Sequence, residues 1–224
     1  MASEVLQGLG SHVFVKPAKK IHEEGDVSAF HGSEAYRDIT IFIMQINRSM
    51  VPTVSSESQL GQKSIQSWEL GSSMVIYSDT VQSLQQLLGR LDAMIEEAPP
   101  DTGPRRFGNA SFRKWYSIMA IRIPELLRAC LPSKVLDAGR TSLDGVDACT
   151  ELNDYLLGSF GSPQRLDYGT GHELSFVAFL ACLWKLGCFK QTTNGAEERG
   201  IALGLVEPYV YIIQTWASTV LFLI

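Results

Sequence analysis

The sequence lacks the patterns that would point to a disulfide-stabilised, zinc-binding or nucleic-acid-binding protein. Its 224 residues include four cysteines, and no two of them form a Cys-x-x-Cys pair. All four lie in apolar surroundings, which favours reduced, buried thiols over a disulfide framework or a zinc site. The 19 Lys and Arg residues are outnumbered by 24 Asp and Glu residues, giving a net charge of −5. Without a basic surface, nucleic acid is excluded as the expected partner.

Several signatures of targeting and catalysis are also missing. The first 20 residues contain no apolar stretch followed by a cleavage site, so secretion is not indicated. The chain has no Gly-x-x-x-x-Gly-Lys-Ser/Thr phosphate loop and no Gly-x-Ser-x-Gly nucleophile motif. His172-Glu173 lacks the second histidine of a zinc protease motif, and Gly169-x-Gly171 lacks the third glycine of a dinucleotide-binding turn.

Apolar residues recur at three- and four-residue steps over most of the chain, whereas strand-like alternation and hairpin dipeptides are missing. We therefore predict an all-α fold. The stretch 51–78 is rich in Ser and Gln and is interpreted as a long loop or partly disordered insert, anchored by Trp68 and 74–77. The expected helices are 33–50 with Ser33 as N-cap, 79–98, 109–119 with Asn109 as cap, 124–130 starting at Pro124, 143–158, and the buried helix 171–188.

The stretch 165–176, Arg-Leu-Asp-Tyr-Gly-Thr-Gly-His-Glu-Leu-Ser-Phe, is the most informative part of the chain. If Gly169 and Gly171 take positive φ angles, backbone N–H groups converge near Thr170, next to the positive end of the following helix. Such a turn would bind an anion, with Arg165 able to fork onto phosphate or carboxylate. Asp167 could cap the helix or orient Arg165. The alternative is a tight turn whose polar groups only cap a buried helix.

A second marked stretch, 106–115, reads Arg-Phe-Gly-Asn-Ala-Ser-Phe-Arg-Lys-Trp. Its aromatic residues repeat at helical spacing and continue to Met119. An aromatic stripe of this kind is more often part of a core than of a recognition surface.

Together and in this order, the two stretches closely resemble the phosphotyrosyl phosphatase activator family, which activates serine/threonine protein phosphatase 2A. Ser33–Asp38, Leu88–Pro100 and Glu198–Tyr209 are also similar to that family. The resemblance runs from about Phe14 to about Ile213 and is weakest across the 51–78 loop.

The resemblance implies an all-α multi-helix bundle with a core, a linker and a lid. It implies a peptidyl-prolyl cis-trans isomerase that binds ATP, Mg²⁺, a proline-containing peptide and the phosphatase catalytic subunit in the cytoplasm or nucleus. Isomerisation needs no nucleophile, because the barrier of about 18–20 kcal/mol comes from amide resonance. No catalytic residue is assigned. The implied nucleotide-binding residues are Arg165, Thr170 and Gly171. The other motif or groove candidates are Asp167, Tyr168, Gly169, His172, Glu173, Arg106, Phe107, Gly108, Asn109, Arg113 and Trp115.

The chain departs from the family pattern after Gln214. The family continues into an acidic segment with Mg²⁺ ligands and much of the peptide groove, whereas 215–224 is an apolar tail. We therefore expect no complete metal site. The expected layout is a flexible N-terminus (1–20), a helical activator domain (21–214) and this tail. The alternative function is a truncated, non-catalytic binding module or inert fragment. A membrane anchor over 208–224 is the less favoured interpretation, because the stretch is short of the roughly 20 apolar residues needed and contains Gln214.

Overall fold

Helices dominate the computed structural model, which describes residues 4–10, 12–55, 64–72, 74–99, 110–139, 142–166, 168–192 and 194–216. The predicted all-α class is confirmed. In chain order the elements are α1 (Glu24–His31), α2 (Glu34–Met50), β1 (Thr53–Ser55), β2 (Ser64–Gln66), α3 (Asp79–Ala93), the 3₁₀ helix η1 (Met94–Glu97), α4 (Ser111–Cys130), α5 (Ser133–Leu136), α6 (Ala148–Gly158), α7 (Thr170–Lys185), α8 (Ala196–Ile201), the π-helical turn η2 (Ala202–Val206) and α9 (Glu207–Trp216).

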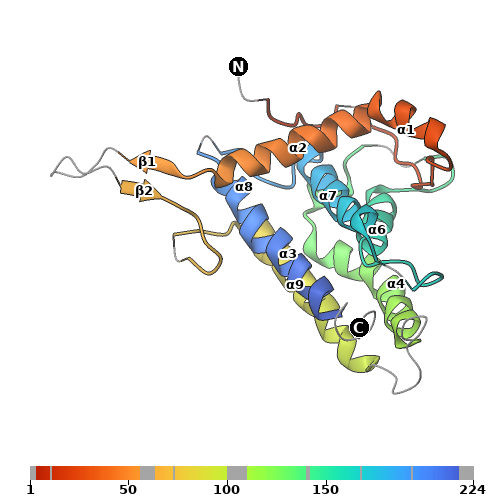
Figure 1. The fold of residues 1–224 in the computed structure, drawn as a ribbon. Coiled ribbons are helices and arrows are strands. Elements are labelled where there is room, and N and C mark those ends of the chain that lie inside the picture. Colours follow the sequence, from red (N-terminus) through yellow and green to blue (C-terminus); the bar gives the residue numbers. More distant parts are fainter. Residues whose placement is uncertain are drawn as a thin grey trace.

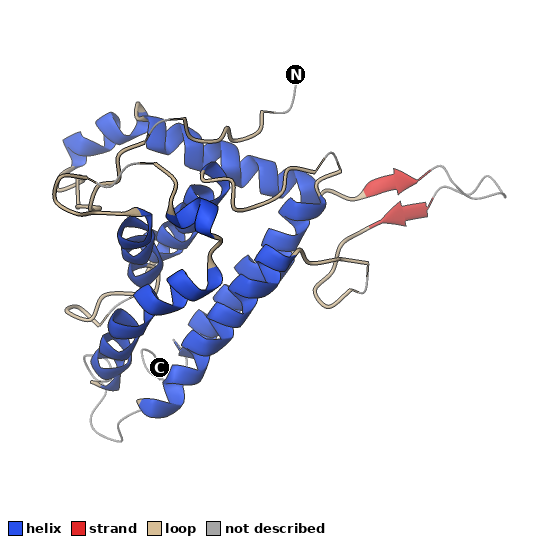
Figure 2. Ribbon diagram, turned by 180° about the vertical axis from the view of Figure 1, so that it is seen from behind, coloured by secondary structure: helices blue, strands red, loops and turns tan. Residues whose placement is uncertain are grey.

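Two groups of helices enclose one core. The elements α8, η2 and α9 follow one another as a continuous rod beside α3, while α4, α6 and α7 pack together (Figure 1). Helix α2 crosses the end of both groups and contacts α7 and α8 (Figure 2). Gly204 in the rod permits close packing on α3, because a Cβ there would lie 2.8 Å from atoms of Tyr77 and Val81. The core between the groups is dominated by large apolar side chains from α3, α4, α6 and α7.

Capping side chains mark the starts of α2, α3 and α6. The Ser33 hydroxyl accepts a hydrogen bond from the Tyr36 backbone N–H, which confirms the predicted cap of α2. Asp147 caps α6 by accepting from the Thr150 N–H at 2.8 Å. Helix α6 therefore begins five residues later than Leu143, the expected start, and the Leu143 side chain is fully exposed.

The predicted helix start at Pro124 is wrong, because this proline lies inside the single helix α4. A proline in a helix interior costs about 3 kcal/mol relative to alanine. Trp115, Met119, Ile123 and Leu127 follow at four-residue steps and are fully buried. Each such side chain contributes roughly 1.5–3 kcal/mol on burial, so the apolar face outweighs the lost backbone hydrogen bond.

The prediction that 51–78 contains no paired strands is also wrong. Strands β1 and β2 form an antiparallel pair with Val54 opposite Ile65, and the pair extends away from the helices (Figure 1). Both side chains are mostly exposed, so no apolar alternation marks the strands in the sequence. One predicted anchor, Trp68, packs under the Arg199 guanidinium group, 4.0 Å from its ring centroid.

The N-terminal segment expected to be flexible contains residues packed on the helices. Leu6 and Phe14 are buried, and the Leu6 carbonyl accepts a hydrogen bond from Trp184 Nε1 at 2.9 Å. Gly139, at φ +70°, leaves space for Phe14, since a Cβ there would lie 2.8 Å from the ring. At the other end, 217–224 of the apolar tail lies outside the described residues. Within the described ranges, no helix is long and apolar enough to cross a membrane.

Candidate functional site

The 165–176 motif lies in the connection between α6 and α7 and in the start of α7, but its glycines do not form the predicted anion-binding turn. Gly169 is extended at φ −162° and Gly171 lies in the first turn of α7, so neither takes a positive φ. The positive φ instead belongs to Leu166, at 53°. Its side chain packs against the core, and its N–H donates to the Ser162 carbonyl at 2.8 Å. Packing of an apolar side chain therefore holds this turn in a conformation unusual for leucine.

His172 has a structural partner on the preceding helix. Its Nδ1 lies 2.7 Å from the Gly158 carbonyl oxygen, so Nδ1 carries the proton and donates. The ring of Tyr168 stacks on His172 with centroids 5.6 Å apart. These two contacts fix the start of α7 against the end of α6.

A chain of hydroxyl groups connects this turn to α9. Tyr209 donates to the Ser159 carbonyl at 2.7 Å, and Tyr168 donates to the Tyr209 oxygen at 2.8 Å. Burial raises the pKa of Tyr168 to about 12 and raises the pKa of Tyr209 further, so both hydroxyls stay protonated. The ring of Tyr209 also stacks on Phe176 at 3.9 Å. Tyr209 was not among the predicted site residues, although it ends the family-like stretch Glu198–Tyr209.

The 106–115 motif contacts the same turn through α4. Arg113 Nε donates to the Pro163 carbonyl at 3.0 Å. The buried ring of Trp115 packs edge-on against Phe160, with centroids 5.5 Å apart, and its Nε1 donates to the Leu91 carbonyl at 3.3 Å. Trp115 is thus a core residue that positions the turn. The candidates Arg106, Phe107, Gly108 and Asn109, together with Asp167, lie outside the described residues.

One face of the turn is open to solvent. Arg165, Gly169, Thr170, Gly171 and Glu173 are all exposed. No side chain caps α7 at Gly169, although the Gly169 carbonyl accepts from the His172 N–H at 2.8 Å. The positive end of the helix dipole therefore lies beside the exposed residues Gly169, Thr170 and Gly171. Glu173 places a negative charge in the same turn and partly offsets that field. Chemically, the face suits a ligand that carries an anionic group.

Metal binding has less support from the geometry. Among the residues that the structure describes, no group of three or more His, Cys, Asp or Glu side chains could hold a metal ion. The described part of this face therefore supplies donors for an anion but no set of carboxylates for Mg²⁺.

Comparison with known proteins assigns the family. The family described as "Phosphotyrosyl phosphate activator (PTPA) protein" matches residues 17–220. The chain belongs to this activator family. It is 52% identical over 204 residues to serine/threonine-protein phosphatase 2A activator 1 of Aspergillus fumigatus, covering 91% of this chain and 42% of that protein. The corresponding activator of Emericella nidulans is 50% identical, with 91% and 46% covered.

A solved structure supports the activator fold. The crystal structure of the PP2A phosphatase activator Ypa1 PTPA1 is similar with a TM-score of 0.69 and 28% identity, over 92% of this chain and 57% of that chain. The chain therefore spans about half the length of the relatives that it matches. Arg113 of the 106–115 motif contacts the turn between α6 and α7, and Tyr168 of the 165–176 motif lies in it.

Proposed function

We propose that this chain binds the catalytic subunit of serine/threonine protein phosphatase 2A and promotes its active conformation. The relatives of Aspergillus fumigatus and Emericella nidulans are named as activators of this phosphatase, which supports the role. The observation that carries it is the contact of Arg113 with Pro163, which joins the 106–115 motif to the turn that contains the start of the 165–176 motif. We therefore place Arg113 and the 165–176 motif in one proposed site at the N-terminus of α7.

We further propose that the exposed face of this turn binds the phosphates of ATP. Arg165 contributes a guanidinium group, and the backbone at Thr170 and Gly171 contributes donors at the positive end of α7. Phosphate oxygens would take the role of the anion that the turn suits. The described residues fit the phosphates but not a protein-held Mg²⁺.

The proposed reaction is cis-trans isomerisation of a peptide bond before proline. An enzyme lowers the barrier of about 18–20 kcal/mol by desolvating the amide and favouring its twisted state. The half-buried, stacked rings of Tyr168 and His172 offer an aromatic surface for this step. The reaction breaks no covalent bond and needs no nucleophile.

Three measurements on the purified chain test these proposals. They are binding to the phosphatase catalytic subunit, recovery of its phosphatase activity, and isomerisation of a proline-containing peptide. We expect binding together with both activities. Binding without either activity would assign the non-catalytic binding role, and no binding would refute the proposal.

Nucleotide binding is tested by thermal unfolding with and without MgATP. Ligand at 100 times its Kd stabilises the native state by about 2.7 kcal/mol. For a chain of this size we expect the Tm to rise by roughly 5–10 °C. The Arg165→Gln variant should lose most of this shift. Arg128→Gln is the matched control, because Arg128 is a half-exposed arginine on α4 that pairs with Asp147. An equal shift in both variants would place the nucleotide elsewhere.

A further inference from the structure

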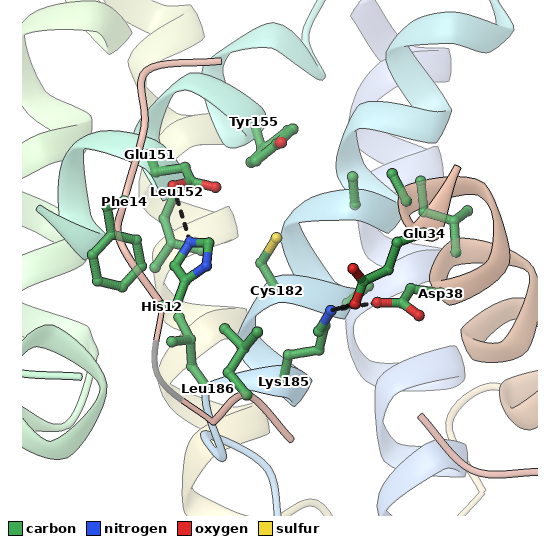
Figure 3. A pocket seen from close by; sticks show the side chains of 15 residues that line it. His12, Phe14, Glu34, Asp38, Glu151, Leu152, Tyr155, Cys182, Lys185 and Leu186 are labelled. Atoms are coloured by element: carbon green, nitrogen blue, oxygen red, sulfur yellow. Dashed lines mark hydrogen bonds and ion pairs between the residues drawn. The ribbon is translucent and has the colours of Figure 1, made fainter. Parts of the chain in front are cut away.

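A cavity of about 300 Å³ lies between the N-terminal segment and helices α2, α6 and α7 (Figure 3). It is separate from the turn described above. Ala181 in its wall lies ten residues along α7 from Gly171, a distance of about 15 Å at 1.5 Å per residue. Its volume is at the lower end of the range for small-ligand sites, roughly 300–1,000 Å³.

The inner surface of the cavity is mostly apolar. Ala178 and Ala181 on α7 leave room that larger side chains would fill, and Phe14, Leu152 and Leu186 close the sides. In Figure 3, Cys182 lies between Glu151 on one side of the cavity and Lys185 with Asp38 on the other. Burial raises the pKa of its thiol to about 12, so the thiol stays protonated. This surface suits an aliphatic group.

The charges of the α2 wall balance one another. Lys185 pairs with Asp38 and lies 3.8 Å from the Glu34 carboxylate. Arg37 contacts the same Asp38 carboxylate at 2.9 Å and Glu34 at 3.5 Å. Although burial alone would raise the pKa of Asp38, the hydrogen bonds from Lys185 and Arg37 lower it below its usual range. Two cations therefore match two carboxylates here.

On the α6 wall a carboxylate retains a free acceptor. Glu151 Oε2 accepts from the Val15 N–H at 2.9 Å and lies 3.6 Å from His12 Nε2. The Glu151 side chain is only 13% exposed, and its Oε1 forms no hydrogen bond with any described residue. One helical turn later, the Tyr155 hydroxyl likewise has no partner among the described residues, and burial raises its pKa to about 12. The imidazole of His12 is the one ion-pair partner of Glu151 among the described residues, and no described Lys or Arg side chain pairs with this carboxylate.

We propose that the cavity binds an ammonium group on a short aliphatic stem, either the lysine side chain of a partner polypeptide or a free alkylamine. The stem lies against the alanines of α7, and the ammonium donates to Glu151 Oε1 and to the Tyr155 oxygen. A hydrogen bond between two ionised groups is stronger than a neutral one, so the cation is favoured over an alcohol of the same shape. Glu151 repels a carboxylate ligand. None of the residues placed in the proposed phosphatase site at the N-terminus of α7 lines this cavity.

The test uses n-pentylammonium as the probe, titrated into the isotopically labelled full chain and followed by NMR. We expect shifts of the amide signals of α6 and α7 around the cavity. 1-Pentanol should bind at least about tenfold more weakly, and pentanoate should not bind. A short lysine peptide and its acetyl-lysine counterpart show whether the ammonium group comes from a partner polypeptide or from a free alkylamine. Tighter binding of the lysine peptide than of the free amine indicates a partner protein, and the reverse indicates a small amine.

Variants connect the binding to Glu151. Glu151→Gln retains an acceptor for the Val15 N–H but removes the charge, and should weaken amine binding by about tenfold or more. Glu125→Gln removes the same charge from the exposed surface of α4 and should change binding less than twofold. Ala178→Leu fills the cavity and should abolish binding, which keeps the test valid if the Glu151 variant fails to fold. Equal binding of the amine and the alcohol, or no binding of the amine, would overturn the proposal.

Discussion

Replacement of Tyr209 by phenylalanine tests whether the hydroxyl chain holds α9 against the turn between α6 and α7. The change removes one oxygen and retains the ring, which stacks on Phe176 at 3.9 Å and 7°. It leaves the carbonyl of Ser159, a fully buried residue, without its donor, and Tyr168 without its acceptor. An unsatisfied buried polar group costs about 1–3 kcal/mol. We expect a loss of about 2 kcal/mol in the free energy of unfolding, or a Tm about 4–8 °C lower.

The matched control is Tyr168→Phe, which removes the hydroxyl that donates to Tyr209 but leaves the Tyr209 hydroxyl in place. Tyr209 can still donate to Ser159 in this variant, so the loss should be about 1 kcal/mol or less. The double variant should be no less stable than Tyr209→Phe alone, because removing the Tyr168 hydroxyl also removes an unpaired group. Urea unfolding followed by circular dichroism gives all three values. Equal losses in the two single variants, or a loss below about 0.5 kcal/mol for Tyr209→Phe, would refute this assignment of the hydroxyl chain.

Three further predictions address packing and charge. Gln45→Leu leaves the buried carboxylate of Glu198 and the Leu6 N–H without partners, so urea unfolding should show a loss of about 2–4 kcal/mol. Gly139→Ala should lower the Tm more than Gly145→Ala, because both glycines have positive φ but only Gly139 of the two is crowded by neighbouring atoms. Equal losses of Tm would mean that backbone strain alone causes the destabilisation. The lowered pKa of Asp38 stabilises the fold above the unfolded pKa of about 3.9 and loses that contribution as pH falls below it. The urea midpoint of Asp38→Asn should therefore fall less than that of the parent between pH 5 and pH 3, and parallel curves would contradict this.

Most of the helical architecture could be predicted from local sequence. Ser33 and the periodic apolar residues after it define α2, because capping and amphipathic spacing act within a few residues. The same approach failed at Pro124, where four buried side chains on α4 outweigh a local helix breaker. It also failed at β1 and β2, whose pairing depends on backbone contacts between separate segments.

The segment that holds the candidate site could be predicted from the sequence, but its backbone conformation and side-chain contacts could not. The motif around Gly169 and Gly171 was found, yet its proposed backbone conformation was wrong because neither glycine takes a positive φ. Packing instead places Leu166 in that region of φ. The burial of Glu198 and Arg199 was also not predicted, because charged residues are usually exposed. These two are buried in the structure, where α8 packs beside α2.

By itself, the sequence determined the helical class and the activator family, because periodicity and long motifs are properties of neighbouring residues. Only the tertiary structure decided which polar groups meet. Tyr168 and Tyr209 are 41 residues apart in the chain, and the hydrogen bond from Val15 to Glu151 spans 136. Such contacts depend on how packed helices cross, which no local pattern specifies.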